Sequence, residues 1–403
     1  MSSKITCYLD SQDYSVLTDP KLESQVYVKM KADLLYLARS KQVRFGFSGA
    51  AISETVALTP ESSRLAELKA EFLVELCEDN ALVSLDKLAK AELNALASRT
   101  DSPLDMFDPE GRWFTDITVD ESPRSVFEMM QDLAKEEMRT MGLSRQQRRA
   151  KSRALFKNGK PRSELRAHIN RQDPNILAMD LVKKYPMRPE YAEIIGRYAL
   201  GKAKESEFTE ALANSLKDVH WMMKWFTTQH ALSSPIAEII RKPGRELGQA
   251  LRSLVDASLL LASTLKVAEI DPDPTQKDGT VSSRWREMEQ RQLVSIIQPP
   301  AASWKINLGD YEYKDVDYWC PGLSTCIRAI FSSVWDSVGG GRKELPSDSQ
   351  PVDALHAVYA PYVDIFRADR FMAPHIQKQV RGRGTVVVPR LSQLIKEIEN
   401  QLL

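Results

Sequence analysis

Two stretches at opposite ends of the chain alternate between apolar strands and amphipathic helices. Residues 3–58 contain the apolar runs Ile5–Leu9 and Val43–Phe47, and a helical pattern follows each run. Residues 345–402 repeat this alternation around two more apolar runs. Strands that alternate with helices form parallel sheets with right-handed crossovers. Because a two-stranded unit is seldom stable alone, we expect both ends to contribute to one doubly wound α/β sheet.

The middle of the chain, residues 59–344, shows helical periods instead. Polar, proline-containing stretches at Thr100–Pro123 and Asp271–Ser283 separate them and predict exposed loops. A large insertion at a surface loop adds little loop-closure entropy. We therefore expect a split α/β domain, 1–58 plus 345–403, and a helical insertion domain, 59–344. The helices predicted in the insertion are Glu61–Cys77, Ala81–Ser98, Ser125–Thr140, Arg145–Lys157, Asn175–Tyr185, Arg188–Leu200, Glu205–Trp225, Gly244–Val267 and Ser283–Ile297.

The charge balance excludes a global field that would attract nucleic acid or membrane. Lys plus Arg and Asp plus Glu number 55 each, so only a local basic patch can bind a polyanion. The four cysteines lack a paired CxxC pattern, which favours buried thiols in a reducing compartment. No apolar core of signal-peptide or membrane-spanning length is present in residues 1–20 or 254–267. We expect a cytoplasmic protein with no membrane partner.

Acidic residues stand where the predicted strands end. Asp10 directly follows the first strand, Glu54 lies on the helix after the second, and Asp369 follows the third, while Asp353 lies in the first turn of the helix that leads into the third. In an open parallel sheet, chemistry gathers outside the carboxyl ends of the strands. Grouped carboxylates raise each other's pKa unless a cation neutralises them. Oxygen-only ligands suit Mg²⁺ or Mn²⁺, so this pattern predicts a metal site.

Each acid also has a structural interpretation. Asp10 fits an Asx-turn or a helix cap, and Asp353 would stabilise the positive end of its helix. Asp369 fits the N-cap of a helix over 371–380, and Glu54 fits a solvated helix face.

Four short segments resemble, in order, the acidic motifs of PIN-domain nucleases. They are Tyr8-Leu9-Asp10-Ser11, Phe47-Ser48-Gly49-Ala50-Ala51-Ile52-Ser53-Glu54, Asp353-Ala354-Leu355-His356-Ala357 and Phe366-Arg367-Ala368-Asp369-Arg370. The resemblance covers residues 3–58 and 345–402. It implies a PIN-like fold in which these four acids bind the metal of a phosphodiesterase that usually acts on RNA. Arg367 stands where the family usually has Thr or Ser.

Three neighbours of these acids need separate interpretation. Asp13 fits either a ligand of the outer shell or a cap of the next turn. His356 lies one helical turn after Asp353. We expect it to pack beneath the site, because a histidine ligand would be unusual beside hard oxygen ligands. Asp364 precedes Asp369 by about 16 Å of strand at 3.3 Å per residue, so we place it at the opposite edge.

The strongest local basic patch lies between Arg139 and Arg166. It includes Arg145, Arg148, Arg149, Lys151 and Arg153, and with Arg367 and Arg370 these are candidate nucleic-acid contacts. The alternative is a solvated helix face. The segment Trp221–Phe226 fits a packed core better than a base-stacking platform, and Gly339–Gly341 lacks the ending of a P-loop and fits a hinge.

Together these patterns predict a Mg²⁺- or Mn²⁺-dependent nuclease, an endoribonuclease first, with a DNA nuclease as an alternative. A bound ion lowers the pKa of water for in-line attack. A second alternative is a PIN-like scaffold that binds nucleic acid or protein without efficient catalysis.

Overall fold

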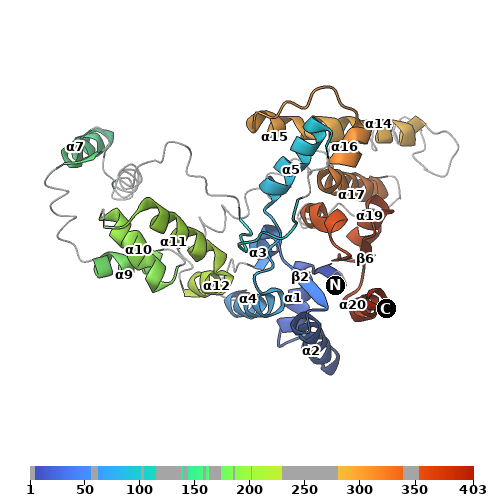
Figure 1. The fold of residues 1–403 in the computed structure, drawn as a ribbon, viewed down its shortest axis with the longest axis horizontal. Helices are drawn as coiled ribbons and strands as arrows, with labels where there is room; N and C mark the ends of the chain where they lie inside the picture. Colours follow the sequence, from blue (N-terminus) through green and yellow to red (C-terminus); the bar gives the residue numbers. More distant parts are fainter. Residues whose placement is uncertain are drawn as a thin grey trace. The chain divides into compact units, whose positions relative to one another are not determined.

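The computed structural model describes most of the chain in two compact units. The described residues are 5–55, 62–100, 104–114, 138, 144–157, 160–162, 174–184, 187–200, 202–228, 280–338 and 354–403. One unit takes in 1–115 and 230–403, and the other takes in 116–229. Figure 1 traces the elements of each.

Four parallel strands form the sheet of the first unit. They are β1 (Ile5–Tyr8), β2 (Val43–Gly46), β5 (Ile365–Arg367) and β6 (Val386–Val388), in the order β2-β1-β5-β6. The register pairs Tyr8 of β1 with Gly46 of β2 and Phe366 of β5. Strands from the two ends of the chain therefore lie side by side, which confirms the shared α/β sheet. The apolar character of the strands follows from burial on both faces.

Helices cover both faces of this sheet. Helix α2 (Gln25–Arg39) contacts β2, and α20 (Leu391–Leu402) contacts α2 and the strands β1, β5 and β6. Helix α19 (Met372–Gln379) contacts β6 and α17 (Pro321–Val338). In Figure 1, α19 and α17 lie above the strands, while α2 and α20 lie below them. Crossovers of one hand that lead outward in opposite directions from the sheet centre produce this double layer.

Helix α1 (Ser11–Thr18) follows the first strand directly and confirms the helix-cap interpretation of Asp10. Asp10 is its N-cap, and Asp13 completes a capping box with it. Reciprocal capping satisfies backbone donors and stabilises a helix of only two turns. The predicted helix that carries Glu54 is confirmed as α3 (Gly49–Thr55).

The chain after Glu54 continues the α/β unit, although sequence analysis assigned it to the insertion. Helix α4 (Ser63–Cys77) contacts α1, α2 and β2, and Ala81 forms a parallel bridge to Phe47 at the edge beside β2. Helical periodicity alone does not distinguish a crossover helix from one in an inserted domain.

The remaining helices of the first unit share a core with the sheet. Sequence analysis predicted α5 (Leu85–Ser98) and α14 (Thr280–Ile296), but no helix over 298–338. The elements that it missed there are α15 (Gln298–Ser303), α16 (Tyr313–Trp319) and α17. Tyr8 and Phe366 stack at 5.3 Å within this core, which also buries Leu93 and Phe331. The 3₁₀ helix η2 (Ala357–Tyr362) packs against α17.

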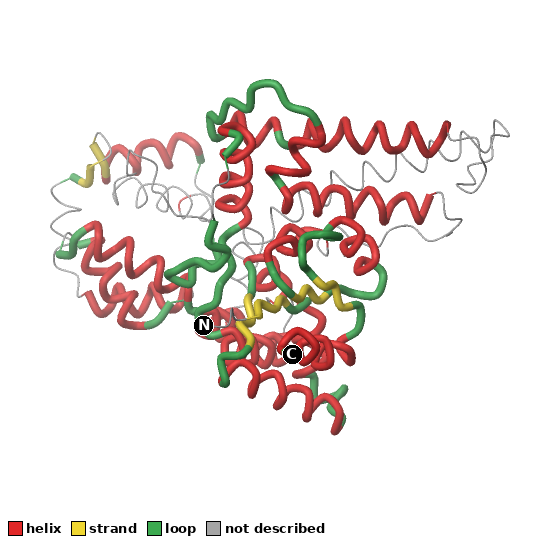
Figure 2. Tube along the Cα trace, turned by 45° about the vertical axis from the view of Figure 1, so that its right-hand side comes forward, coloured by secondary structure: helices red, strands yellow, loops and turns green. Residues whose placement is uncertain are grey.

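In its described residues the second unit contains helices and a small antiparallel hairpin, which is the yellow segment at the upper left of Figure 2. Its elements are α7 (Arg145–Leu155), β3 (Phe156–Lys157), β4 (Lys160–Pro161), α9 (Pro174–Lys184), α10 (Pro189–Ala199), α11 (Glu205–Lys217) and α12 (Val219–Thr228). The single helix predicted over Glu205–Trp225 divides at Asp218, whose carboxylate accepts the Trp221 N–H at 2.8 Å. Met222 and Met223 are buried, as a core interpretation requires. The side chains of Trp225 and Phe226 lie outside the described part.

Several predictions fall on residues outside the described part. They concern Asp353, the helix Gly244–Val267, the glycine hinge 339–341 and nearly all of the predicted helix 125–140. Among the described helices, none has the length and apolar character needed to cross a bilayer.

Candidate functional site

The sheet has one topological switch point, between β1 and β5. From β1 the chain crosses over to β2 on one side, and from β5 it crosses over to β6 on the other. In doubly wound sheets, ligands bind outside the carboxyl ends of the strands at such a point. Asp10 follows β1 and Asp369 follows β5, so these two acids flank it. We call this edge, with Asp10, Glu54 and Asp369, the rim.

Asp10 is a buried carboxylate that caps the N-terminus of α1. The residue is 9% exposed, and its carboxylate accepts the Gln12 N–H at 3.3 Å and the Asp13 N–H of the capping box. The Ser11 hydroxyl lies 3.4 Å from its Oδ1. Burial raises the pKa of Asp10; the neighbouring His356 opposes this rise and the neighbouring Glu54 adds to it. The rim therefore holds a carboxylate whose negative charge the protein compensates poorly.

Glu54 is held by a chain of buried hydrogen bonds. His356 Nε2 lies 3.0 Å from Glu54 Oε2, and His356 Nδ1 lies 2.5 Å from the hydroxyl of Tyr8. The Tyr8 hydroxyl also lies 2.6 Å from Ser48 Oγ. Because a carboxylate only accepts, Nε2 donates to Glu54, and a neutral ring then accepts the Tyr8 proton at Nδ1. Burial favours a raised pKa, but His356 and the Ser11 hydroxyl hold the pKa of Glu54 below its usual value.

Asp13 and Arg367 form a buried ion pair beneath the rim. Arg367 Nη2 lies 3.0 Å from Asp13 Oδ1, and both side chains are almost fully buried. Asp13 Oδ2 also accepts the Asp10 N–H at 3.2 Å. Burial raises the pKa of Asp13 to about 7, with Arg367 opposing the rise and Asp10 adding to it. The capping interpretation of Asp13 is confirmed, and the same side chain contacts the backbone of Asp10.

Arg367 is not available as a surface contact for nucleic acid. Its Nη1 donates to the Val388 carbonyl at 3.3 Å, and it is 7% exposed. Its Nε is buried and has no hydrogen-bond partner. Arg370, three residues later, is exposed.

Asp369 contacts the start of α19, but it is not the N-cap of that helix, which is Phe371. Asp369 Oδ1 accepts the Met372 N–H at 2.5 Å at the start of α19. Its side chain is partly exposed at the rim, and a carboxylate retains further lone pairs after one such bond. This contact and a ligand role are therefore compatible.

The structure brings together Asp10 and Glu54, with Asp369 on the same edge. Within the described residues, no three His, Cys, Asp or Glu side chains form a group that could hold a metal ion. Asp353, the fourth predicted acid, lies outside those residues. Asp364 accepts the Thr6 N–H at 2.7 Å near the start of β1, so its placement at the opposite edge is confirmed.

Tyr8 and Ser48 are site residues that the sequence analysis did not single out. Both lie inside the motifs quoted above: Tyr8 is two residues before Asp10, and Ser48 directly precedes Gly49. A tyrosine that ends a buried strand is one available signal, because a buried phenol hydroxyl requires a polar partner.

A second buried acid lies on α5, away from the strands' ends. Glu92 accepts the backbone N–H groups of Gly322 at 2.5 Å and Leu323 at 3.0 Å, at the start of α17, and the hydroxyl of Tyr362. Burial raises the pKa of Glu92 to about 7, and these three donors oppose the rise. A side chain at Gly322 would place its Cβ 2.5 Å from the Val358 carbonyl oxygen and 2.8 Å from Glu92. Only glycine allows this close approach.

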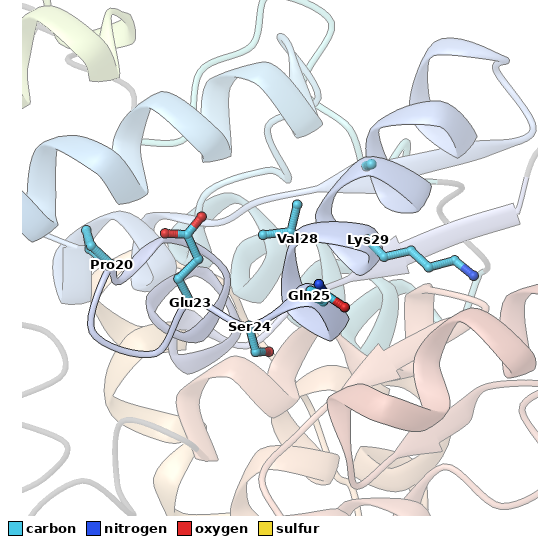
Figure 3. Close-up of a pocket in the computed structure, with 7 residues that line it drawn as sticks. Pro20, Glu23, Ser24, Gln25, Val28 and Lys29 are labelled. Carbon is cyan, nitrogen blue, oxygen red and sulfur yellow. The ribbon is translucent and has the colours of Figure 1, made fainter.

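A surface hollow and a basic helix complete the candidate features. The hollow lies where the α1–α2 connection meets α2, and none of the predicted site residues lines it (Figure 3). Its lining residues are Pro20, Glu23, Ser24, Gln25, Val28, Lys29 and Ala32. The predicted basic segment forms α7, none of whose residues is buried.

No protein-family model, no curated protein and no solved structure matches this chain.

Proposed function

We propose that the rim is the active site of a PIN-like, Mg²⁺- or Mn²⁺-dependent phosphodiesterase, an endoribonuclease first. The observation that carries the proposal is the placement of Asp10 and Asp369 on either side of the switch point, with Glu54 electrostatically coupled to Asp10. The resemblance to the four acidic motifs supplies the fourth candidate ligand, Asp353.

The donor chemistry fits such an ion. Every candidate ligand is a carboxylate oxygen, which Mg²⁺ and Mn²⁺ prefer. Asp10 is buried beside a second carboxylate, and both its burial and this neighbour raise its pKa, so a cation would lower the free energy of its charged form. When bound, the ion would activate a water and stabilise the leaving oxygen.

The protein's own residues would orient the ligands. His356 fixes Glu54 through Nε2, and Tyr8 fixes the ring through Nδ1. The Asp13–Arg367 pair anchors the N-terminus of α1 beneath Asp10. Such supporting contacts set the orientation of the ligands. Their removal typically weakens metal binding by about 10-fold to 100-fold.

A second candidate, a PIN-like scaffold that binds nucleic acid or protein without cutting, is favoured by one specific observation. Glu54, Asp13 and Asp369 each already have a partner inside the protein, in His356, Arg367 and the Met372 N–H. On this alternative, the acids are structural.

The test is cleavage of end-labelled RNA and of DNA with the same sequence by the full-length protein, with Mn²⁺, with Mg²⁺ and with EDTA. We expect metal-dependent cleavage of RNA that Asp10→Asn reduces by about 1000-fold, a change of about 4 kcal/mol in transition-state stabilisation. The matched control is Asp364→Asn, which changes the same residue type at the opposite edge and should cleave normally. Cleavage of DNA alone would establish the DNA nuclease. Absence of metal-dependent cleavage would overturn the proposal in favour of the scaffold.

A further inference from the structure

The second unit exposes a row of arginines on one face of α7. Arg145, Arg149 and Arg153 are exposed and spaced four residues apart, and Arg148, which is partly buried, lies beside them. At 1.5 Å per residue this arginine face extends over about 12 Å. The opposite side of the helix carries Gln147, Ala150, Lys151 and Ala154.

The charges of the arginine face are not compensated within the described part of the chain. There, no acidic side chain lies within ion-pair distance of these arginines, whereas Arg188 pairs with Asp218 and Lys183 with Asp180 in the same unit. Like charges at (i, i+4) destabilise a helix. Binding of an anion would remove this repulsion.

The hairpin after α7 lengthens the basic segment. Arg162 donates its backbone N–H to the Leu155 carbonyl at 2.9 Å, so the end of the hairpin returns to the last turn of α7. Lys157 and Lys160 belong to the paired strands β3 and β4.

We propose that the arginine face of α7 binds the phosphate backbone of a nucleic-acid strand. Guanidinium groups bind phosphates through paired hydrogen bonds, and arginine predominates on this face. A separation of four residues, about 6 Å along the helix, repeats twice and suits a ligand with regularly repeated negative charge. A nucleic-acid backbone provides one such charge per nucleotide.

The composition of the other side of α7 argues against a lipid surface. A helix that lies in a membrane interface buries a face rich in Trp, Phe or Leu. The side of α7 opposite the arginine face carries glutamine, alanine and Lys151, and no large apolar residue. Since the whole chain has no net charge, this local patch, rather than a global field, would attract the strand.

This inference deepens the proposed function, because it names where a strand would be held, but its evidence comes from a different unit and its readout does not require cleavage. The experiment is fluorescence anisotropy of the full-length protein with a labelled RNA and with DNA of the same sequence, in EDTA. The titration is repeated at salt concentrations from 50 to 200 mM. Over this range a protein with six phosphate contacts loses about 10³-fold or more in affinity.

The test variant replaces Arg145, Arg148, Arg149 and Arg153 with Gln. We expect its affinity to fall by about 100-fold and its slope of log K against log salt to flatten by about 0.7 to 0.9 per lost contact. A control variant removes equal charge from exposed positions of the first unit: Lys21→Gln, Lys378→Gln, Arg381→Gln and Lys396→Gln. It should keep the wild-type slope. A third variant with Lys at the four arginines should keep most of the slope but bind more weakly, because lysine lacks the paired donors.

An unchanged slope in the test variant, or equal losses in the control variant, would overturn the inference. Anionic vesicles or polyglutamate bound through α7 without RNA or DNA binding would assign the face to a lipid or protein partner, and would also overturn it. Equal binding of RNA and DNA identifies the backbone as the ligand, whereas preference for RNA identifies the ribose as an added contact. If the wild-type protein binds RNA but never cleaves it, and Asp10→Asn binds with the same salt slope, the proposed function is refuted and this inference stands.

Discussion

Glu92 and Asp10 are buried in the same unit, yet different groups surround their carboxylates. Glu92 receives two backbone N–H groups and the Tyr362 hydroxyl, all on one carboxylate. Asp10 accepts the Gln12 N–H at 3.3 Å and the Asp13 N–H of the capping box, and it lies near a second carboxylate, Glu54. Burial raises the pKa of both acids, so burial alone does not mark a functional acid. The neighbouring carboxylate at the rim distinguishes Asp10 as a candidate ligand.

The difference follows from where each acid lies. Glu92 faces the N-terminus of α17, where unpaired backbone N–H groups attract a negative group. Asp10 lies at the N-terminus of α1, where Asp13 completes the capping box by accepting the Asp10 N–H and is itself paired with Arg367. Glu92 thus joins α5 to α17 across the core, whereas Asp10 lies beside a second carboxylate, Glu54, at the rim.

The largest predicted effect concerns stability and separates the two acids directly. Glu92→Ala leaves two backbone N–H groups and the Tyr362 hydroxyl without acceptors, so the free energy of unfolding should fall by about 4 kcal/mol. Asp10→Ala removes a cap, worth about 1 kcal/mol, but also relieves a poorly compensated charge. Urea unfolding followed by circular dichroism measures both. Equal losses in the two variants would contradict the distinction.

The next effect concerns the pH dependence of stability. The pKa of Glu92 rises from 4.5 to about 7 on folding, so the folded protein retains a proton that the unfolded chain releases between these values. The stabilising contribution is fully present below pH 4.5 and is lost as the pH rises to about 7. Over this window the free energy of unfolding should fall by about 3 kcal/mol through Glu92 alone.

Glu92→Gln should remove that part of the decline, because glutamine keeps an acceptor but does not titrate. A decline due to Asp13, whose pKa is also raised to about 7, should remain. Glu75→Gln, at an exposed surface pair with Arg39, is the matched control and should leave the wild-type profile unchanged. Urea unfolding at pH 4.5, 6 and 8 measures the change. A wild-type profile in Glu92→Gln would assign the titration elsewhere.

The strands and the acids at their ends were accessible from the sequence. Runs such as Val386–Val388 are apolar because both faces of the sheet are covered, and a strand buried in this way leaves its signature in the sequence itself. Because Asp10, Glu54 and Asp369 come after predicted parallel strands, the sequence also predicted that they lie at one edge of the sheet. Local patterns therefore predicted the sheet that the two ends share.

The partners of those acids were not accessible, because they depend on register and on distant segments. His356 reaches Glu54 across 302 residues of sequence, and Arg367 reaches Asp13 only because β5 lies beside β1. The role of α4 was missed for a related reason, since a crossover helix and an inserted helix have the same period. The capping box that starts α1 was visible as Asp10 and Asp13, but turn chemistry explains the same residues equally well.

A smaller effect is expected from metal binding, and it tests whether the uncompensated charge is at the rim. Mn²⁺ at about 100 times its dissociation constant should stabilise the wild-type protein by about 2.7 kcal/mol. Glu92→Gln should keep this stabilisation, while Asp10→Asn should lose it. Thermal unfolding with Mn²⁺ and with EDTA measures it, and Asp364→Asn is the control for loss of an acid at the opposite edge. Equal stabilisation of Asp10→Asn and the wild type would place the ion elsewhere.

The smallest effect is expected at Tyr8, whose hydroxyl links Ser48 and His356 behind Glu54. Tyr8→Phe should lower the free energy of unfolding by about 1 kcal/mol, the usual cost of one buried hydrogen bond. Tyr359→Phe is a close control, because this buried tyrosine stacks on Tyr8 and donates to the Val83 carbonyl at 3.0 Å. The two variants should lose similar stability. Only Tyr8→Phe should also weaken Mn²⁺ binding, by about 10-fold, because it frees the ring that orients Glu54. Calorimetric titration with Mn²⁺ distinguishes them, and identical affinities in the two variants would reduce the Tyr8–His356–Glu54 chain to a purely structural contact like that of Glu92.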